Sequence, residues 1–142
     1  MSGFTFTKEE RLCHRKDITT LFREGKSVFT PGYSAKFLIN CKPQTYPVRV
    51  LFSVPKRNFK RAVDRNRIKR LLREAYRRNK TEIYEFLNQK GISLHIGIVY
   101  SGRSIPSYGL ADEKISLILH QIKKEIKKQN ISGSDHFGSN GE

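Results

Sequence analysis

Acidic side chains are scarce in this sequence. Its 142 residues contain 13 Asp and Glu against 28 Lys and Arg, which gives a net charge of +15. So large a surplus destabilises the folded state through self-repulsion, and a polyanion relieves it by displacing condensed counterions. We therefore expect nucleic acid as the partner. An anionic membrane surface and a merely soluble basic protein are the alternatives.

Cysteine and long apolar runs are scarce as well. Cys13 and Cys41 match no CxxC or zinc spacing, and we interpret them as reduced thiols, with a disulfide as the alternative. Residues 1–11 lack the apolar core of a secretory signal. No apolar run approaches the roughly 18 residues that cross a bilayer. We expect a soluble, cytoplasmic protein.

Side chains suited to catalysis are few and scattered. The four histidines show no HxxxH or His-Cys spacing, and we interpret His95, in an apolar stretch, as structural rather than metal-ligating. The acids near the N-terminus form no obvious catalytic pair, and Gly-rich phosphate loops are absent. We expect no catalytic residue and no metal site in the protein itself.

The first half of the chain shows a helix followed by strands. Apolar spacing predicts a helix at about residues 15–24, with Gly25 as its C-cap. A period of two then predicts strands over residues 33–39 and 48–54. The polar stretch between them favours an antiparallel hairpin, and residues 27–29 offer a further short strand.

The second half alternates between helices and one strand. A long helix covers residues 60–79, and residues 81–89 either continue it or form a second short helix before Gly91. Residues 94–100 form a strongly apolar strand, which we expect in the centre of the sheet. After a loop at 102–109, apolar positions between Ile115 and Ile126 mark a last amphipathic helix.

The order of elements, α-β-β-(β)-α-β-α, defines the fold class. It predicts an α+β protein with one mixed sheet of about four strands. We see no domain boundary and expect a single RNA-binding domain over residues 1–130. Residues 131–142 have the composition of a disordered tail.

Positive charge is concentrated in residues 56–80. This segment holds twelve bases and two acids, a net charge of +10 in 25 residues, whereas the other 117 residues carry only +5. At about 100° per residue, one face of the predicted helix is apolar, with Ile68, Leu71, Leu72, Ala75 and Tyr76. The opposite face is polar and mostly basic, with Asn66, Lys69, Arg70, Arg73 and Arg77. A rigid row of cations on one face is typical of a phosphate-binding surface, and a solvated helix face is the plainer alternative.

The residues from Lys56 to Glu74 resemble the signature of the bacterial ribonuclease P protein subunit. The shared core is Arg-Asn-Arg-Ile-Lys-Arg followed by Leu-x-Arg-Glu, preceded by a strand that ends in Ser-Val-Pro-Lys-Arg. The resemblance extends over roughly residues 9–128. It implies a component of an endoribonuclease whose catalyst is a large RNA, which removes the 5′ leader of precursor tRNA. It also implies that magnesium is bound mainly by the RNA partner.

The resemblance implies two binding surfaces on this chain. The surface for ribonuclease P RNA consists of Lys56, Arg57, Lys60, Arg61, Arg65, Asn66, Arg67, Lys69, Arg70 and Arg73. The cleft for the precursor-tRNA leader lies between the first helix and the sheet, with Ile18, Phe22, Ser34, Lys36 and Ser53. Members of the family often have aromatic residues at the positions of Ile18 and near Lys36. Their absence here weakens the case for base stacking at those positions, and Phe22 is equally well explained as a core residue.

Three other functions fit parts of the pattern. A ribosomal or general structured-RNA-binding protein shares the electrostatics and is distinguished only by the ordered strand–loop–helix motif. A stand-alone nuclease needs a carboxylate cluster for metal-assisted hydrolysis, which the sequence lacks. A DNA-reading helix-turn-helix needs a short helix just before the recognition helix, whereas a strand is predicted there. We therefore expect neither DNA nor membrane as a partner.

Overall fold

The computed structural model describes residues 7–40 and 46–129. A single 3-10 turn, η2 (Lys8–Glu10), precedes the first helix, α1 (Arg15–Glu24). Three strands follow, β1 (Lys26–Thr30), β2 (Tyr33–Asn40) and β3 (Val48–Ser53). The long helix α2 (Ala62–Lys90), strand β4 (Ser93–Tyr100) and helix α3 (Tyr108–Gln129) complete the described chain. The predicted α+β class and the order of its elements are confirmed.

The four strands form one mixed sheet in the order β1-β2-β4-β3. β2 pairs antiparallel with β1 and β4, whereas β3 pairs parallel with β4. The predicted hairpin between residues 33–39 and 48–54 is therefore wrong, because β4 lies between these two strands. β4 is mostly buried, and an interior position covers such a strand on both faces. Its predicted central place is confirmed.

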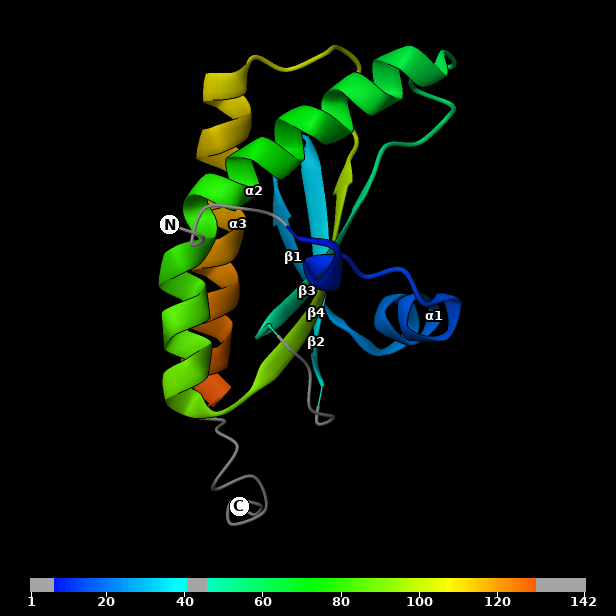
Figure 1. Ribbon diagram of the computed structural model, residues 1–142. Helices are drawn as coiled ribbons and strands as arrows, with labels where there is room; N and C mark the ends of the chain where they lie inside the picture. The colour runs from blue at the N-terminus through cyan, green and yellow to red at the C-terminus, as the bar shows by residue number, and fades with distance from the viewer. Residues whose placement is uncertain (1–6, 41–45, 130–142) are drawn as a thin grey trace.

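Helix α2 is one continuous helix, so residues 81–89 continue it rather than forming a separate helix. Gly91 ends it in the left-handed conformation, with φ of 71°, which glycine adopts without steric cost. The first part of α2 crosses the sheet, and its last part runs beside α3 (Figure 1). Ile83, Leu87 and Ile122 are among the side chains that bury this contact.

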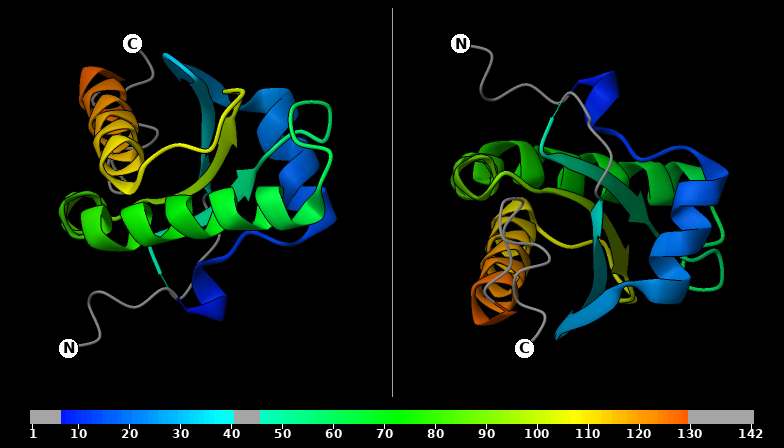
Figure 2. Two further views of the ribbon diagram at one scale, coloured as in Figure 1. Left: turned by 90° about the horizontal axis from the view of Figure 1, so that it is seen from above. Right: turned by 90° about the horizontal axis from the view of Figure 1, so that it is seen from below.

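The two faces of the sheet are covered differently. Val28, Ala35, Ile98 and Phe52 form one continuous row across all four strands and belong to the core beneath α2 and α3. Helix α1 lies on the opposite side of the sheet from α3, as the view from below shows (Figure 2). The helix predicted to face RNA and the predicted leader cleft therefore lie on two different sides of one sheet.

Most remaining boundaries agree with the sequence pattern. The helix at 15–24 has the predicted ends, and the optional strand at 27–29 exists as β1. Two details differ. Residues 8–10 form a 3-10 turn, an element that the sequence pattern did not predict, and α3 begins at Tyr108, inside the predicted loop. The predicted tail at 131–142 lies outside the described residues.

Candidate nucleic-acid interface

The cationic surface is built on the first turns of α2 and the loop before it. Ile68 and Leu72 are completely buried against the core, which fixes the rotation of the helix. The predicted apolar face is confirmed, although Leu71 is partly exposed. Most of the predicted RNA-facing side chains are exposed, namely Lys56, Arg57, Lys60, Arg61, Asn66, Arg67 and Arg70. Arg65, Lys69 and Arg73 are half-buried.

Arg65 has a structural contact that the sequence did not predict. Its Nη1 donates hydrogen bonds to the carbonyl oxygens of Phe59 at 2.8 Å and Lys60 at 3.0 Å. Phe59 is itself buried and stacks on Tyr100, with 6.2 Å between ring centroids. Arg65 therefore holds the loop that carries Lys56, Arg57 and Lys60 in a fixed position beside the helix.

The two acids of this segment, Asp64 and Glu74, pair with nearby arginines. Arg61 Nε lies 3.8 Å from Asp64 Oδ2. Arg77 donates to Glu74, and this hydrogen bond lowers the pKa of the Glu74 carboxyl. The surface that remains is dominated by cations, and their number on one rigid helix favours binding to closely spaced phosphates.

Four of the predicted leader-cleft residues lie on one side of the sheet, and Ile18 lies one helical turn before Phe22. Ser34 and Ser53 flank Val99 in one row across the sheet, and Lys36 lies beside Gly97 in the next row. Lys36 Nζ donates a hydrogen bond of 2.7 Å to the carbonyl of Phe22. Phe22 of α1 is thus joined directly to Lys36 of β2, and Ser34 and Ser53 lie on the same face of the sheet although they are far apart in the sequence.

Phe22 packs directly on the sheet. A Cβ atom added at Gly97 would lie 2.8 Å from the Cζ atom of Phe22, so the ring needs a glycine beneath it. Phe22 and Ile18 are half-buried, whereas Leu21 is completely buried. Phe22 therefore contributes to packing, and part of its surface remains exposed beside the row of Ser34, Val99 and Ser53.

Phe29 is the aromatic residue that sequence reasoning missed on this side. It pairs with Ser34 in the row that continues through Val99 to Ser53, and it is 69% exposed. The neighbouring side chain Val28 points to the opposite face and is buried. The sequence contains a signal for this position. Val28 and Phe29 are adjacent in a short strand, and adjacent side chains of a strand point to opposite faces of the sheet, so one of the two had to face outwards.

His95 lies beneath α1 in the row of Leu38 and Arg49. It is 6% exposed, which agrees with the prediction of a structural histidine. Burial lowers its pKa, with Arg49 acting in the same direction and Asp17 against it. Its Nε2 atom has no hydrogen-bond partner among the described residues.

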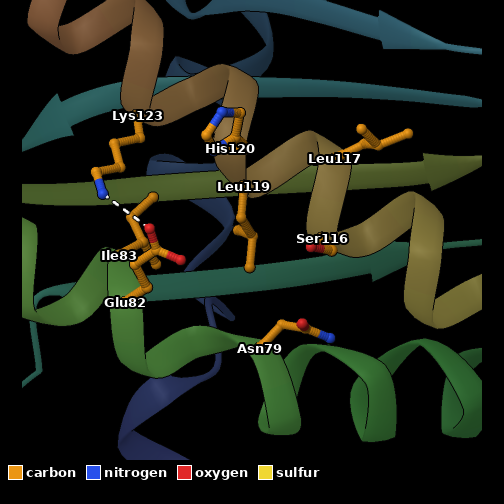
Figure 3. Close-up of a pocket in the computed structure, with 8 residues that line it drawn as sticks. All are labelled: Asn79, Glu82, Ile83, Ser116, Leu117, Leu119, His120 and Lys123. Atoms are coloured by element: carbon orange, nitrogen blue, oxygen red, sulfur yellow. Dashed lines mark hydrogen bonds and ion pairs between the residues drawn. The ribbon is translucent and has the colours of Figure 1, made fainter.

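A pocket of about 190 Å³ lies between α2 and α3, on a different part of the molecule. His120 lies at its edge, and Lys123 crosses it to reach Glu82 at 3.0 Å (Figure 3). Asn79 of the same pocket donates to Asp112 at 2.7 Å. These polar groups already join the two helices, so we assign the pocket to helix packing.

Residues 7–40 and 46–129 contain neither a metal-ligand cluster nor a membrane-spanning helix. No group of three or more His, Cys, Asp or Glu side chains is arranged to hold a metal ion. No helix there combines the length and apolar character needed to cross a membrane. The fold and the surface together define a class, a small α+β protein that presents a rigid cationic helix to a polyanion.

Comparison with known proteins defines the family. The model of the Ribonuclease P family matches residues 6–103. The ribonuclease P protein component of Chlorobium phaeobacteroides is 36% identical over 136 residues, covering 87% of this chain and 93% of that protein. The same component of Porphyromonas gingivalis is 33% identical over 123 residues, covering 87% and 90%. This chain belongs to the ribonuclease P protein family.

A solved structure supports the same fold. The Staphylococcus aureus RNase P protein aligns with a TM-score of 0.57, covering 84% of this chain and 97% of that one. Because the sequence identity is 22%, this likeness supports the architecture and says nothing about individual site residues.

Proposed function

We propose that this chain is the protein component of ribonuclease P, a cytoplasmic ribonucleoprotein that removes the 5′ leader from precursor tRNA. The observation that carries the proposal is the one-sided cationic surface of α2 and its preceding loop, in a chain that belongs to this family. The bond-breaking step belongs to the RNA subunit, and this chain supplies binding and positioning.

The proposed docking surface for the catalytic RNA is the exposed face around Arg67 and Arg70. Arginine binds phosphate oxygens in a bidentate manner, and α2 spaces its residues by about 1.5 Å along the axis. Ile68 and Leu72 prevent the helix from rotating, because both are completely buried. The cations therefore keep one arrangement before RNA arrives, which reduces the entropy lost on binding.

The proposed leader site is the row of Ser34, Val99 and Ser53, bounded on one side by Phe22 of α1. Single-stranded nucleic acid binds to sheets through exposed aromatic side chains and nearby cations. Phe29 extends this row with an exposed ring and supplies the π-face that Ile18 and Lys36 lack. Lys36 holds the end of α1 through the Phe22 carbonyl, so its contribution is to fix α1 against the sheet beside this row.

Magnesium is the ion that we propose for the reaction, bound mainly by RNA and substrate phosphates. Bound to the RNA, magnesium would neutralise phosphate charge and would activate the attacking water. The cations of this chain act in the same direction, because they offset repulsion between two RNA molecules. We therefore expect the protein to lower the magnesium concentration that cleavage requires.

The test is 5′-leader removal at low magnesium, with ribonuclease P RNA alone, the protein alone, and both together. We expect cleavage only where RNA is present and a clear acceleration when the protein is added. Cleavage by the protein alone would contradict the proposal, as would no gain from adding it. Equal binding to unrelated structured RNAs without acceleration would favour a general structured-RNA-binding protein.

A further inference from the structure

The chain before α1 is anchored to α2 by a buried cluster of polar groups. Glu10 lies at the centre of this cluster and is 0% exposed. Its Oε2 atom accepts hydrogen bonds of 2.5 Å from Lys80 Nζ and from Tyr84 Oη. Its Oε1 atom accepts a hydrogen bond of 2.8 Å from the backbone N–H of Thr7. Both carboxylate oxygens are therefore hydrogen-bonded, and the buried charge of Glu10 is matched by that of Lys80.

The partners of Glu10 belong to one stripe of α2. Tyr76, Lys80 and Tyr84 are spaced by four residues, so they lie on the same face of the helix. The hydroxyl groups of Tyr76 and Tyr84 are joined by a hydrogen bond of 3.0 Å. The ring of Tyr76 packs edge-on against Phe52 of β3, with 5.8 Å between ring centroids. The cluster thus joins the chain before α1 to a long helix and to the strand at one edge of the sheet.

After Glu10, the chain is bonded to β3 before it enters α1. Leu12 is buried, and its backbone N–H donates a hydrogen bond of 3.0 Å to the carbonyl of Val50. Only Cys13 and His14 separate Leu12 from the first residue of α1. Three steps of extended chain span at most about 11 Å, so the position of Leu12 restricts where α1 can begin.

Helix α1 has few contacts of its own that would fix its orientation. Leu21 is its one buried residue, and Phe22 is half-buried. A helix of ten residues is marginal by itself in water, so its place depends on what holds its two ends. Lys36 holds the C-terminal end through the carbonyl of Phe22. The N-terminal end depends on the segment that Glu10 anchors.

We propose that Glu10, Lys80 and Tyr84 are positioning residues for recognition of the 5′ leader. Glu10 and Lys80 are too deeply buried to touch RNA, and they act by fixing the N-terminal end of α1 on the side of the sheet where Phe22 lies. The helix that carries the cationic surface thus also sets the orientation of the helix that bounds the leader site. The role in leader recognition rests on the proposed function, whereas the anchor itself does not.

Two variants weaken the anchor with little change of shape. Tyr84→Phe removes one hydrogen bond to Glu10 and keeps the ring, and Glu10→Gln removes the buried negative charge. Both should be less stable than the unaltered protein, so each needs a control of equal stability. Ile122 is completely buried in the core and lies outside the anchor. Ile122→Val or Ile122→Ala, chosen by urea unfolding to match each anchor variant, serves as that control.

The first measurement is amide hydrogen exchange of the free protein, which tests the anchor without RNA. The N–H of Leu12 should exchange faster in Tyr84→Phe and Glu10→Gln than in the matched Ile122 variant. We expect a difference of roughly tenfold or more, the effect of losing one hydrogen bond to a charged group. Equal exchange at Leu12 in anchor variants and controls would show that Glu10 does not hold this segment, and would overturn the inference.

The second measurement compares precursor tRNA with mature tRNA, as dissociation constants of the ribonucleoprotein assembled with saturating protein. Saturation removes any effect of the variants on docking to the catalytic RNA. The preference for precursor tRNA should fall by roughly threefold to tenfold in the anchor variants, because affinity falls with the fraction of molecules in which α1 is correctly placed. The matched Ile122 variants should keep the preference of the unaltered protein.

The two measurements separate a positioning role from a merely structural one. Faster exchange at Leu12 together with a reduced preference for precursor tRNA, both absent from the Ile122 controls, supports the inference. Faster exchange with an unchanged preference would overturn the role in leader recognition, as would an equal loss of preference in the controls. If the unaltered protein shows no preference for precursor tRNA, the proposed leader site itself fails, and that result is obtained before any variant is compared.

Discussion

Lys36 and Phe22 join the sheet to the end of helix α1 through one hydrogen bond, 2.7 Å from Nζ to the carbonyl oxygen. This contact fixes one wall of the proposed leader site. Lys36→Met removes the donor, keeps much of the side-chain volume, and leaves the carbonyl without this partner. We expect the free energy of unfolding to fall by about 1–3 kcal/mol and leader-containing substrates to bind more weakly.

The comparison that tests Lys36 is between precursor tRNA and mature tRNA, measured as dissociation constants of the assembled ribonucleoprotein. Lys36→Met and Phe22→Ala should both weaken precursor binding more than mature tRNA binding. If both substrates lose affinity equally, α1 does not contribute to binding of the leader.

Phe29 offers the most specific test of the leader site, because its ring is 69% exposed and its loss should not disturb the core. Phe29→Ala should weaken binding of leader-containing substrates by about 1–3 kcal/mol, the range for one base stacked on an aromatic ring. Phe29→Tyr preserves the ring and serves as the matched control. Titrations with leaders of increasing length should show where the difference begins, and no difference at any length would rule out stacking at this position.

Arg67 and Arg65 should respond differently to substitution by alanine. Arg67 is exposed, so Arg67→Ala should reduce the salt slope of RNA binding by about 1 with little change in stability. Arg65 also holds the carbonyls of Phe59 and Lys60. Arg65→Ala should therefore lower the free energy of unfolding as well, by about 1.5–3 kcal/mol.

These arginine variants are compared by RNA binding over a range of salt concentrations and by urea unfolding. Arg103→Ala, outside the proposed surface, is the control for loss of one positive charge. A salt slope that stays the same in Arg67→Ala would show that this side chain neutralises no phosphate.

The buried pair of Glu10 and Lys80 should be important for stability. Burial raises the pKa of the Glu10 carboxyl, but hydrogen bonds from Lys80, Tyr84 and the Thr7 backbone outweigh this effect and leave the pKa below its ordinary value. Lys80→Met leaves a buried carboxylate without its cation, which typically costs about 3–5 kcal/mol. Urea unfolding of Lys80→Met, Glu10→Gln and the double variant should show that the double loss is smaller than the sum of the two single losses.

His95 should make stability depend on pH. Burial holds its folded-state pKa below the ordinary value of 6.5, so the unfolded chain binds this proton at a higher pH than the folded chain. Its contribution to stability is therefore complete above about pH 6.5 and is lost as the pH falls further. Urea unfolding at pH 7.5 and at about 5.5, the region where histidine titrates, should show the decrease.

Two further measurements distinguish His95 from other titrating groups. His95→Leu should flatten the decrease, whereas His120→Gln, which changes an exposed histidine, should not. The ring resonances of His95 should titrate below pH 6.5 in the folded protein. A His95 ring that titrates at or above pH 6.5 would refute the buried neutral state.

The sequence by itself determined the features that depend on local spacing. The cationic face of α2 follows from apolar side chains such as Ile68 and Leu72, which recur at the helical period, and the helix end follows from Gly91. The family signature lies in the same continuous segment. Local backbone preferences and a single amphipathic face decide such features, so no distant contact was needed to predict them.

Only the tertiary structure decided which distant segments meet. The short connection between β2 and β3 favoured a hairpin, but burial of the apolar strand β4 on both faces placed it between them. Glu10 reaches Lys80 across 70 positions, and the next residue, Arg11, lies close enough to Arg73 to lower its pKa. The outward ring of Phe29 likewise depends on which face of the sheet α3 covers. Such pairings are selected by packing of the whole chain, and local periodicity carries no information about the partner.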